Sequence, residues 1–142
     1  MNISIKNTLI TIIDFKIFKD SYDKESDTNT GRFTVKFDLK YFDDKPNIFV
    51  VVFHISILDK DELFKLDISL DATFETDEEI DDDFKSSSFP NINAPAIGYP
   101  FIRAQVANIT LNAGIDPIML PTINFTTFNK EPKKDSDNSI VE

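Results

Sequence analysis

The segment from Asn93 to Phe125 decides the fold, and it reads NAPAIGYPFIRAQVANITLNAGIDPIMLPTINF. It is almost free of charge, although 28% of the residues in the chain are charged. Four of its apolar residues fall at helical spacing, namely Ile102, Val106, Ile109 and Ala113. This spacing predicts a long helix with an apolar face that packs on the rest of the domain.

Signals at both ends bound this helix. Asn93 or Tyr99 is expected to cap its start, because the prolines that follow each are tolerated in a first turn. Gly114 can adopt the left-handed conformation that closes a helix, and Asp116-Pro117 prevents the helix from continuing.

A second stripe lies nearly opposite the first and consists of Ala104, Ala107 and Leu111. A helix that is apolar on two opposed sides is usually buried on both. One side fits a sheet of the same chain, and the small, flat side suits another helix. We therefore predict that this stripe is an interface between copies of the chain; coverage by a loop or tail of the same chain is the alternative.

Two motifs in the segment resemble the SecB export chaperones. Tyr99-Pro-Phe-Ile-Arg103 resembles the family's aromatic-Pro-aromatic-x-Arg signature, and Gly114-Ile-Asp-Pro-Ile-Met-Leu-Pro-Thr-Ile-Asn-Phe125 is similar to a second family motif in the same order and at the same spacing. The resemblance implies a four-stranded antiparallel sheet with a long crossover after its first strand. It also implies a dimer of dimers that holds non-native polypeptide.

Strand patterns in the first half of the chain agree with that fold. Ile3 to Phe18 reads as a strand with a bulge near Leu9-Ile10 and Ile12-Ile13, and a long polar loop, Lys19 to Gly31, follows. Three segments then alternate apolar and polar residues across short turns: Arg32–Phe42, Ile48–Leu58 and Leu63–Phe74. The second of these begins apolar on both faces, which favours a central position. We predict an α+β fold with a Greek-key antiparallel sheet and one long helix.

The remaining segments are polar or short. Thr76 to Phe84 carries six carboxylates and is expected to be a solvated loop, and Lys85 to Asn93 is expected to be a linker. Residues 1–128 would form one domain, with residues 129–142 a charged, disordered tail. Pro132 leaves a second, C-terminal helix short or absent.

The composition of the chain excludes some classes of function and compartment. The 142 residues suit one domain, and the net charge of −10 argues against nucleic-acid binding. The chain has no cysteine, no stretch long enough to span a membrane and no signal-peptide pattern, so we expect a cytoplasmic protein without disulfides.

Catalytic chemistry finds little support. His54 is the only histidine and has Ser56 two residues away on the same strand face, but no recognisable acid or nucleophile elbow accompanies them. Arg103 is expected to cover apolar surface or to bond backbone carbonyls. We predict no catalytic residue, no metal site and no cofactor, and so a protein that is not an enzyme.

Client-binding residues are sought in the apolar run after Gly114. Pro117 and Pro121 keep this run out of a helix or central strand, so it should lie extended across the edge of the sheet. Met119 and Phe128 are the candidates for an open surface, and Ile118 and Phe125 are further candidates, with Phe125 more buried.

Together with these observations, the resemblance implies an ATP-independent holdase that assembles as a dimer or tetramer. Its client would be an unfolded preprotein or, alternatively, a dedicated antitoxin of a toxin–antitoxin–chaperone module. The resemblance adds the SecA motor as a candidate partner. A non-catalytic ligand-binding or structural α+β module is the further alternative.

Overall fold

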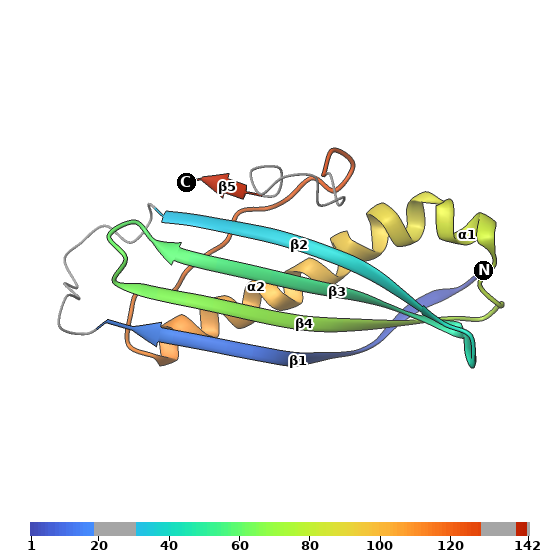
Figure 1. Cartoon of the computed structure of the whole chain (residues 1–142). Helices are drawn as coiled ribbons and strands as arrows, with labels where there is room; N and C mark the ends of the chain where they lie inside the picture. Colours follow the sequence, from blue (N-terminus) through green and yellow to red (C-terminus); the bar gives the residue numbers. More distant parts are fainter. Residues whose placement is uncertain (19–30, 129–138, 142) are drawn as a thin grey trace.

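An antiparallel sheet with one long helix across one of its faces forms the body of the molecule (Figure 1). The structure is a computed structural model, and it describes residues 1–18, 31–128 and 139–141. In chain order the elements are β1 (Ile3–Ile17), β2 (Gly31–Phe42), β3 (Lys45–Asp59), β4 (Phe64–Thr76), α1 (Asp82–Ser86), the π-helical turn η2 (Phe89–Asn93), α2 (Ala94–Asn112) and β5 (Ser139–Val141). The predicted α+β class, with four antiparallel strands and one long helix, is confirmed.

The strands lie in the order β1-β4-β3-β2-β5. Strands β2, β3 and β4 follow one another as antiparallel hairpins, and β1 pairs with β4 rather than with its neighbour in sequence, β2. Strands β4 and β3 therefore lie between β1 and β2, as the Greek-key prediction requires. The prediction that β3 is an interior strand is confirmed as well, since it pairs with β2 and β4.

Strand β1 is irregular in two places. Its pairing with β4 shifts register between Ile5 and Asn7 and again between Ile10 and Ile12. The second shift confirms the bulge predicted from the broken alternation, because each extra residue moves the apolar side chains after it to the other face.

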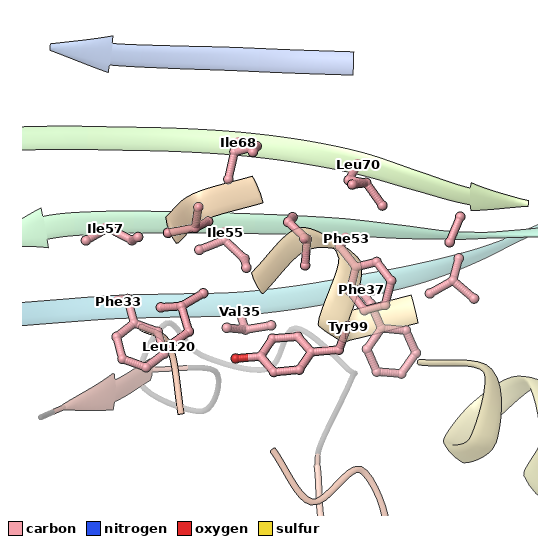
Figure 2. Close-up of a cluster of buried hydrophobic side chains, with 14 of the residues drawn as sticks. Phe33, Val35, Phe37, Phe53, Ile55, Ile57, Ile68, Leu70, Tyr99 and Leu120 are labelled. Atoms are coloured by element: carbon pink, nitrogen blue, oxygen red, sulfur yellow. The ribbon is translucent and has the colours of Figure 1, made fainter. Parts of the chain in front are cut away.

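The core lies between the sheet and α2. Alternate residues of β2, β3 and β4 point toward the helix, and Figure 2 shows Phe33, Val35 and Phe37 of β2 beside Tyr99 of α2. Gly98 lets the helix come close: a Cβ at this position would lie 2.8 Å from the Phe53 ring. A glycine at this position therefore leaves room for the Phe53 ring between helix and sheet.

The start of α2 differs from the prediction. Asn93 precedes the helix but its side chain makes no capping hydrogen bond, and its own backbone is helical. The reason is that the turn η2 runs directly into α2, so that Asn93 is not the residue at which a helix begins. Tyr99 lies inside the helix and is buried.

The end of α2 follows the prediction. Gly114 has a φ of 97°, which is the left-handed conformation expected after the last turn. The buried face continues from Ile102 and Val106 to Thr110, whereas Ala113 is exposed and Ile109 is half-buried. The buried face thus ends one turn before the predicted stripe. It follows a spacing of four residues to Thr110 and does not reach Ala113.

Two segments predicted to be irregular contain short helices. Asp81 accepts a hydrogen bond from the backbone N–H of Phe84 at 2.8 Å and so caps α1 inside the acidic loop. Phe84 and Phe89 pack against one another, and Phe84 contacts Phe49 of the core, which orders the predicted linker.

Two predicted segments fall mostly outside the described residues. Residues 19–30 of the predicted long loop are not described, and Gly31 is the first residue of β2. Of the predicted tail, Ser139–Val141 forms β5, and residues 129–138 and 142 are not described. The domain boundary at residue 128 stays a prediction.

Candidate functional site

Residues 113–128, which we call the crossing segment, leave the end of α2, pass over the same face of the sheet and reach β2 (Figure 1). Two side chains of α2 hold this segment. The Tyr99 hydroxyl donates to the carbonyl oxygen of Pro121 at 2.7 Å, and the Ile118 N–H donates to the Thr110 hydroxyl at 2.9 Å. The segment has no regular secondary structure. These two bonds therefore satisfy two of its backbone groups that a helix or sheet would otherwise pair.

The two sequence motifs therefore meet in space. Tyr99 of the first motif contacts Phe125 of the second, with ring centroids 5.8 Å apart in an edge-to-face arrangement. Ile115, Leu120 and Phe125 of the crossing segment are themselves buried. The motifs form one structural unit in which α2 anchors an extended stretch of chain.

A cavity of about 200 Å³ opens where the crossing segment passes the ends of the strands. It is lined by residues 31–33 of β2, 57–59 of β3, Phe64 of β4 and 117–120 of the crossing segment. Two of the predicted client-binding residues, Ile118 and Met119, line it, and Met119 is 66% exposed at its rim. Figure 2 shows Leu120 beside Phe33 at this end of the core.

The other two predicted client-binding residues lie elsewhere. Phe125 is buried and Phe128 is half-buried, and both pack on Phe37 of β2, with ring centroids 5.8 Å and 5.5 Å away. These two rings form a separate aromatic cluster further along β2. The structure thus brings Ile118 and Met119 to the cavity and places Phe125 and Phe128 outside its lining.

Phe33, Ile57 and Phe64 line the cavity and were not singled out from the sequence. Each belongs to the inward-facing set of its strand, so burial in the core already explained why it is apolar. Their position near strand ends was the only available signal.

The outward face of α2 carries exposed apolar side chains. Ala104 is exposed, Ala107 is half-buried and Leu111 is 56% exposed, so no described part of the chain covers the predicted interface stripe. Ile97 and Phe101 extend the same face and are also exposed. Ile97, Phe101, Ala104 and Leu111 follow the spacing of a helix–helix seam, a signal that the prediction missed.

Strand β1 presents a further apolar surface. Leu9, Ile12 and Ile13 are all more than half exposed, and among the described strands β1 lies at one end of the sheet. An exposed strand with these side chains offers both backbone hydrogen-bonding groups and apolar area to another chain. The sequence pattern did not separate these residues from the core residues of β1.

A polar network occupies the solvent face of the sheet. The Nδ1 atom of His54 and the Oγ atom of Ser69 are 2.6 Å apart, and the Ser56 hydroxyl donates to the Asp67 carboxylate. His54 Nε2 lies 3.5 Å from Ser56 and 3.9 Å from Asp67. The network ties β3 to β4 through side chains that are partly exposed.

Among the residues that the structure describes, the buried side-chain atoms Tyr41 Oη and Arg103 Nε have no hydrogen-bond partner. The carbonyl bonds predicted for Arg103 are therefore absent at Nε. Burial raises the pKa of Tyr41, because the phenolate would lose its hydration. The Lys85 ammonium lies 5.0 Å from the centre of the Tyr41 ring, and Tyr41 is at the opposite end of β2 from the cavity lined by Met119.

Within the part of the chain that the structure describes, no three histidine, cysteine or carboxylate side chains gather as a metal site would require. None of the helices among these residues is both long and apolar enough to cross a membrane.

Comparisons with known proteins identify the family. Residues 18–135 match the family model described as preprotein translocase subunit SecB. An uncharacterised protein of Methanocaldococcus jannaschii is 35% identical over 91 residues, which are 61% of this chain and 57% of that protein. The protein-export protein SecB of Anaplasma phagocytophilum is 33% identical over 85 residues, 58% of this chain and 53% of that protein. The matches span about half the length of these curated relatives.

A solved structure confirms the architecture. The SecB-like chaperone Rv1957 of Mycobacterium tuberculosis, in complex with a ChAD peptide from the HigA1 antitoxin, matches with a TM-score of 0.65 over 85% of this chain and 89% of that chain. Its sequence is 12% identical, so the likeness concerns the fold. With the family model covering most of the chain, the chain belongs to the SecB family, whose members are chaperones.

Proposed function

We propose that this protein is an ATP-independent holdase, and not an enzyme, that binds extended, non-native polypeptide. Membership of the SecB family supports the class of function. The observation that carries the proposal is Met119, a large apolar side chain exposed at the rim of a cavity whose lining combines apolar side chains with Arg32 and Asp59. An exposed apolar surface at a cavity is typical of a binding site rather than of a finished core.

The cavity suits one anchoring side chain of a client. Burying a Leu- or Phe-sized side chain contributes about 1.5–3 kcal/mol, which gives weak binding by itself. Methionine adapts to side chains of different shape, since its chain is unbranched and its sulfur polarisable. Weak anchors of this kind gain strength when several copies of the site engage one long client.

Self-association would supply those copies. We infer a dimer or tetramer whose contacts use the outward face of α2, including Ala104, Ala107 and Leu111, and the exposed side chains of β1. Both surfaces expose apolar area that the described residues of the same chain leave uncovered. Such surfaces on a monomer mark interaction sites.

The client is either an unfolded preprotein or one dedicated antitoxin, and the SecA motor is a candidate partner for the first role. The export protein of Anaplasma phagocytophilum supports the first role by its sequence. The antitoxin role is the second candidate, since the Mycobacterium tuberculosis chaperone of like fold holds an antitoxin peptide. Either role would place the protein in the cytoplasm. A structural or ligand-binding module is the remaining alternative.

The proposal is tested by measuring the aggregation of a chemically unfolded protein, followed by light scattering without nucleotide. We expect the wild type to slow aggregation, and we expect Met119→Ser with Ile118→Ser to weaken this effect about tenfold, because two apolar contacts are lost. Phe42→Ser is the matched control, since Phe42 is also exposed but lies at the other end of β2. A wild type that never slows aggregation would leave the structural-module alternative standing.

Affinity capture from a host lysate followed by mass spectrometry distinguishes the two chaperone roles. Many captured preproteins support export, and one captured antitoxin supports the dedicated role.

A further inference from the structure

The short strand β5 lies on the edge of β2 beside the Met119 cavity. It pairs antiparallel with β2 through Arg32 and Val141, Phe33 and Ile140, and Thr34 and Ser139. Residues 31–33 of β2 are also a wall of the cavity. One end of β2 therefore serves two purposes: it binds the chain's own C-terminal strand and it borders the candidate client site.

We propose that β5 occupies a strand-addition site for client polypeptide, so that β5 and a client exclude one another. The inference rests on the proposed holdase function and adds to it a binding mode and a built-in competitor. The client is an extended segment that adds to the β2 edge by backbone hydrogen bonds and places a large apolar side chain in the cavity.

The geometry of an added strand supports this mode. A strand hydrogen-bonded to β2 lies within about 5 Å of it, and its alternate side chains point to the face on which the cavity opens. Backbone pairing does not depend on the client's sequence, and the cavity asks only for one apolar side chain. A site of this kind accepts many unfolded segments in extended form.

The small size of β5 makes it displaceable. It has three residues, whereas β2 runs from Gly31 to Phe42. Beyond Thr34, β2 pairs with β3 on one side, and no described strand pairs with it on the other. A client segment long enough to pair with residues 35–42 as well gains hydrogen bonds that β5 cannot make, and so it replaces β5.

The first experiment weakens β5 in the full-length chain. Ile140→Pro removes a backbone N–H and disfavours strand geometry, and Lys134→Pro places the same residue in the tail outside β5. The probe is reduced, carboxymethylated lactalbumin, which stays unfolded, and binding is measured by fluorescence anisotropy. We expect Ile140→Pro to bind the probe about five- to tenfold more tightly than the wild type, because β5 no longer occupies the client site. Lys134→Pro should bind as the wild type does.

The second experiment locks β5 in place. The sequence has no cysteine, and Thr34 and Ser139 are direct partners, so Thr34→Cys with Ser139→Cys allows one disulfide between β2 and β5. The oxidised double variant should bind the probe at least tenfold more weakly than the same protein after reduction with dithiothreitol.

The outcomes separate this inference from the proposed function. If the wild type binds the probe but Ile140→Pro binds no more tightly, or the oxidised and reduced double variants bind equally, competition by β5 is refuted while the holdase stands. Failure of the disulfide to form refutes the pairing itself. If no version binds the probe, the holdase proposal fails and the inference fails with it.

Discussion

At the scale of single residues, two side chains of α2 decide where the crossing segment lies. Tyr99 and Thr110 are both buried, and each makes a hydrogen bond to the backbone of the segment, at Pro121 and Ile118 respectively. Thr110 also donates to the carbonyl oxygen of Val106 at 2.8 Å, so its hydroxyl is used as donor and acceptor at once. A polar residue on the buried face of the helix is thus explained by the segment that it holds.

Thr110→Val should test this role. The substitution keeps the shape but leaves the Ile118 N–H without its acceptor, so we expect the free energy of unfolding to fall by about 1–3 kcal/mol. Urea denaturation measures the change. Thr110→Ser retains the hydroxyl and should lower the free energy of unfolding by less. An equal decrease for serine and valine would show that the hydrogen bond is unimportant.

Tyr41 should titrate late. Burial favours the neutral phenol, so the pKa of Tyr41 in the folded protein lies above its ordinary value of 10.0. The stability that the fold has with a neutral Tyr41 is fully present below about pH 10. It is lost as the pH rises from 10 through the folded pKa, because the unfolded chain ionises Tyr41 more readily. The difference in ultraviolet absorbance between the wild type and Tyr41→Phe reports the titration, and a midpoint at or below 10 would contradict the effect of burial.

At the scale of elements, the approach of α2 to the sheet depends on Gly98. An added Cβ would lie 2.8 Å and 3.1 Å from two atoms of the Phe53 ring and 3.3 Å from the Cβ of Ala72. Phe53 and Ala72 are fully buried, so neither has open space into which to move. The approach of the helix to the sheet at Gly98 therefore requires the absence of a side chain.

Gly98→Ala sets two effects against each other. Alanine favours a helix by about 1 kcal/mol over glycine, but overpacking a tight core costs about 1–3 kcal/mol. We expect the clash to prevail and the melting temperature to fall. Ala96→Gly, at an exposed position of α2, measures the propensity term alone. A Gly98→Ala variant more stable than the wild type would mean that the helix shifts without cost.

Particular elements show how far the sequence could predict this molecule. The alternation of apolar and polar residues in Arg32–Phe42, Ile48–Leu58 and Leu63–Phe74 was sufficient to predict three strands, although the second begins apolar on both faces. The prediction that α2 is capped at Asn93 was wrong, because a capping residue does not reveal that another helical turn precedes it. The cavity residues Phe33 and Phe64 were missed because their meeting with Met119 depends on contacts far apart in sequence, and β5 is too short for a pattern.

At the scale of the whole molecule, two uncovered surfaces bear on assembly. The outward face of α2 lies opposite the buried face that packs on the sheet, and β1 is at the far end of the sheet order from β5. One surface suits helix–helix packing and the other suits strand pairing. Two different contacts of this kind can build an assembly larger than a dimer, because each can obey its own twofold axis.

Phe101→Glu should weaken the assembly. A charge in the centre of an apolar helix face loses its hydration when that face is covered. We expect the wild type to have a mass above the 16.2 kDa of one chain in light scattering, and the variant to have a lower mass at the same micromolar concentration. Thr122→Glu adds the same charge at an exposed position of the crossing segment and should change nothing. A wild type of 16.2 kDa would exclude self-association.

The pairing of β1 with β4 also has a consequence for synthesis on the ribosome. β1 is translated first, but its partner β4 follows roughly 50 to 70 residues later, which at about 5–20 residues per second is a delay of several seconds. During that time Leu9, Ile10, Ile12 and Ile13 have no strand to pair with. A newly made chain therefore passes through a stage in which it carries an exposed, extended apolar segment, the same kind of segment that we propose as its client. Limited proteolysis of ribosome-bound chains stalled before and after β4 would detect this stage, and a finished copy of the protein could itself protect it.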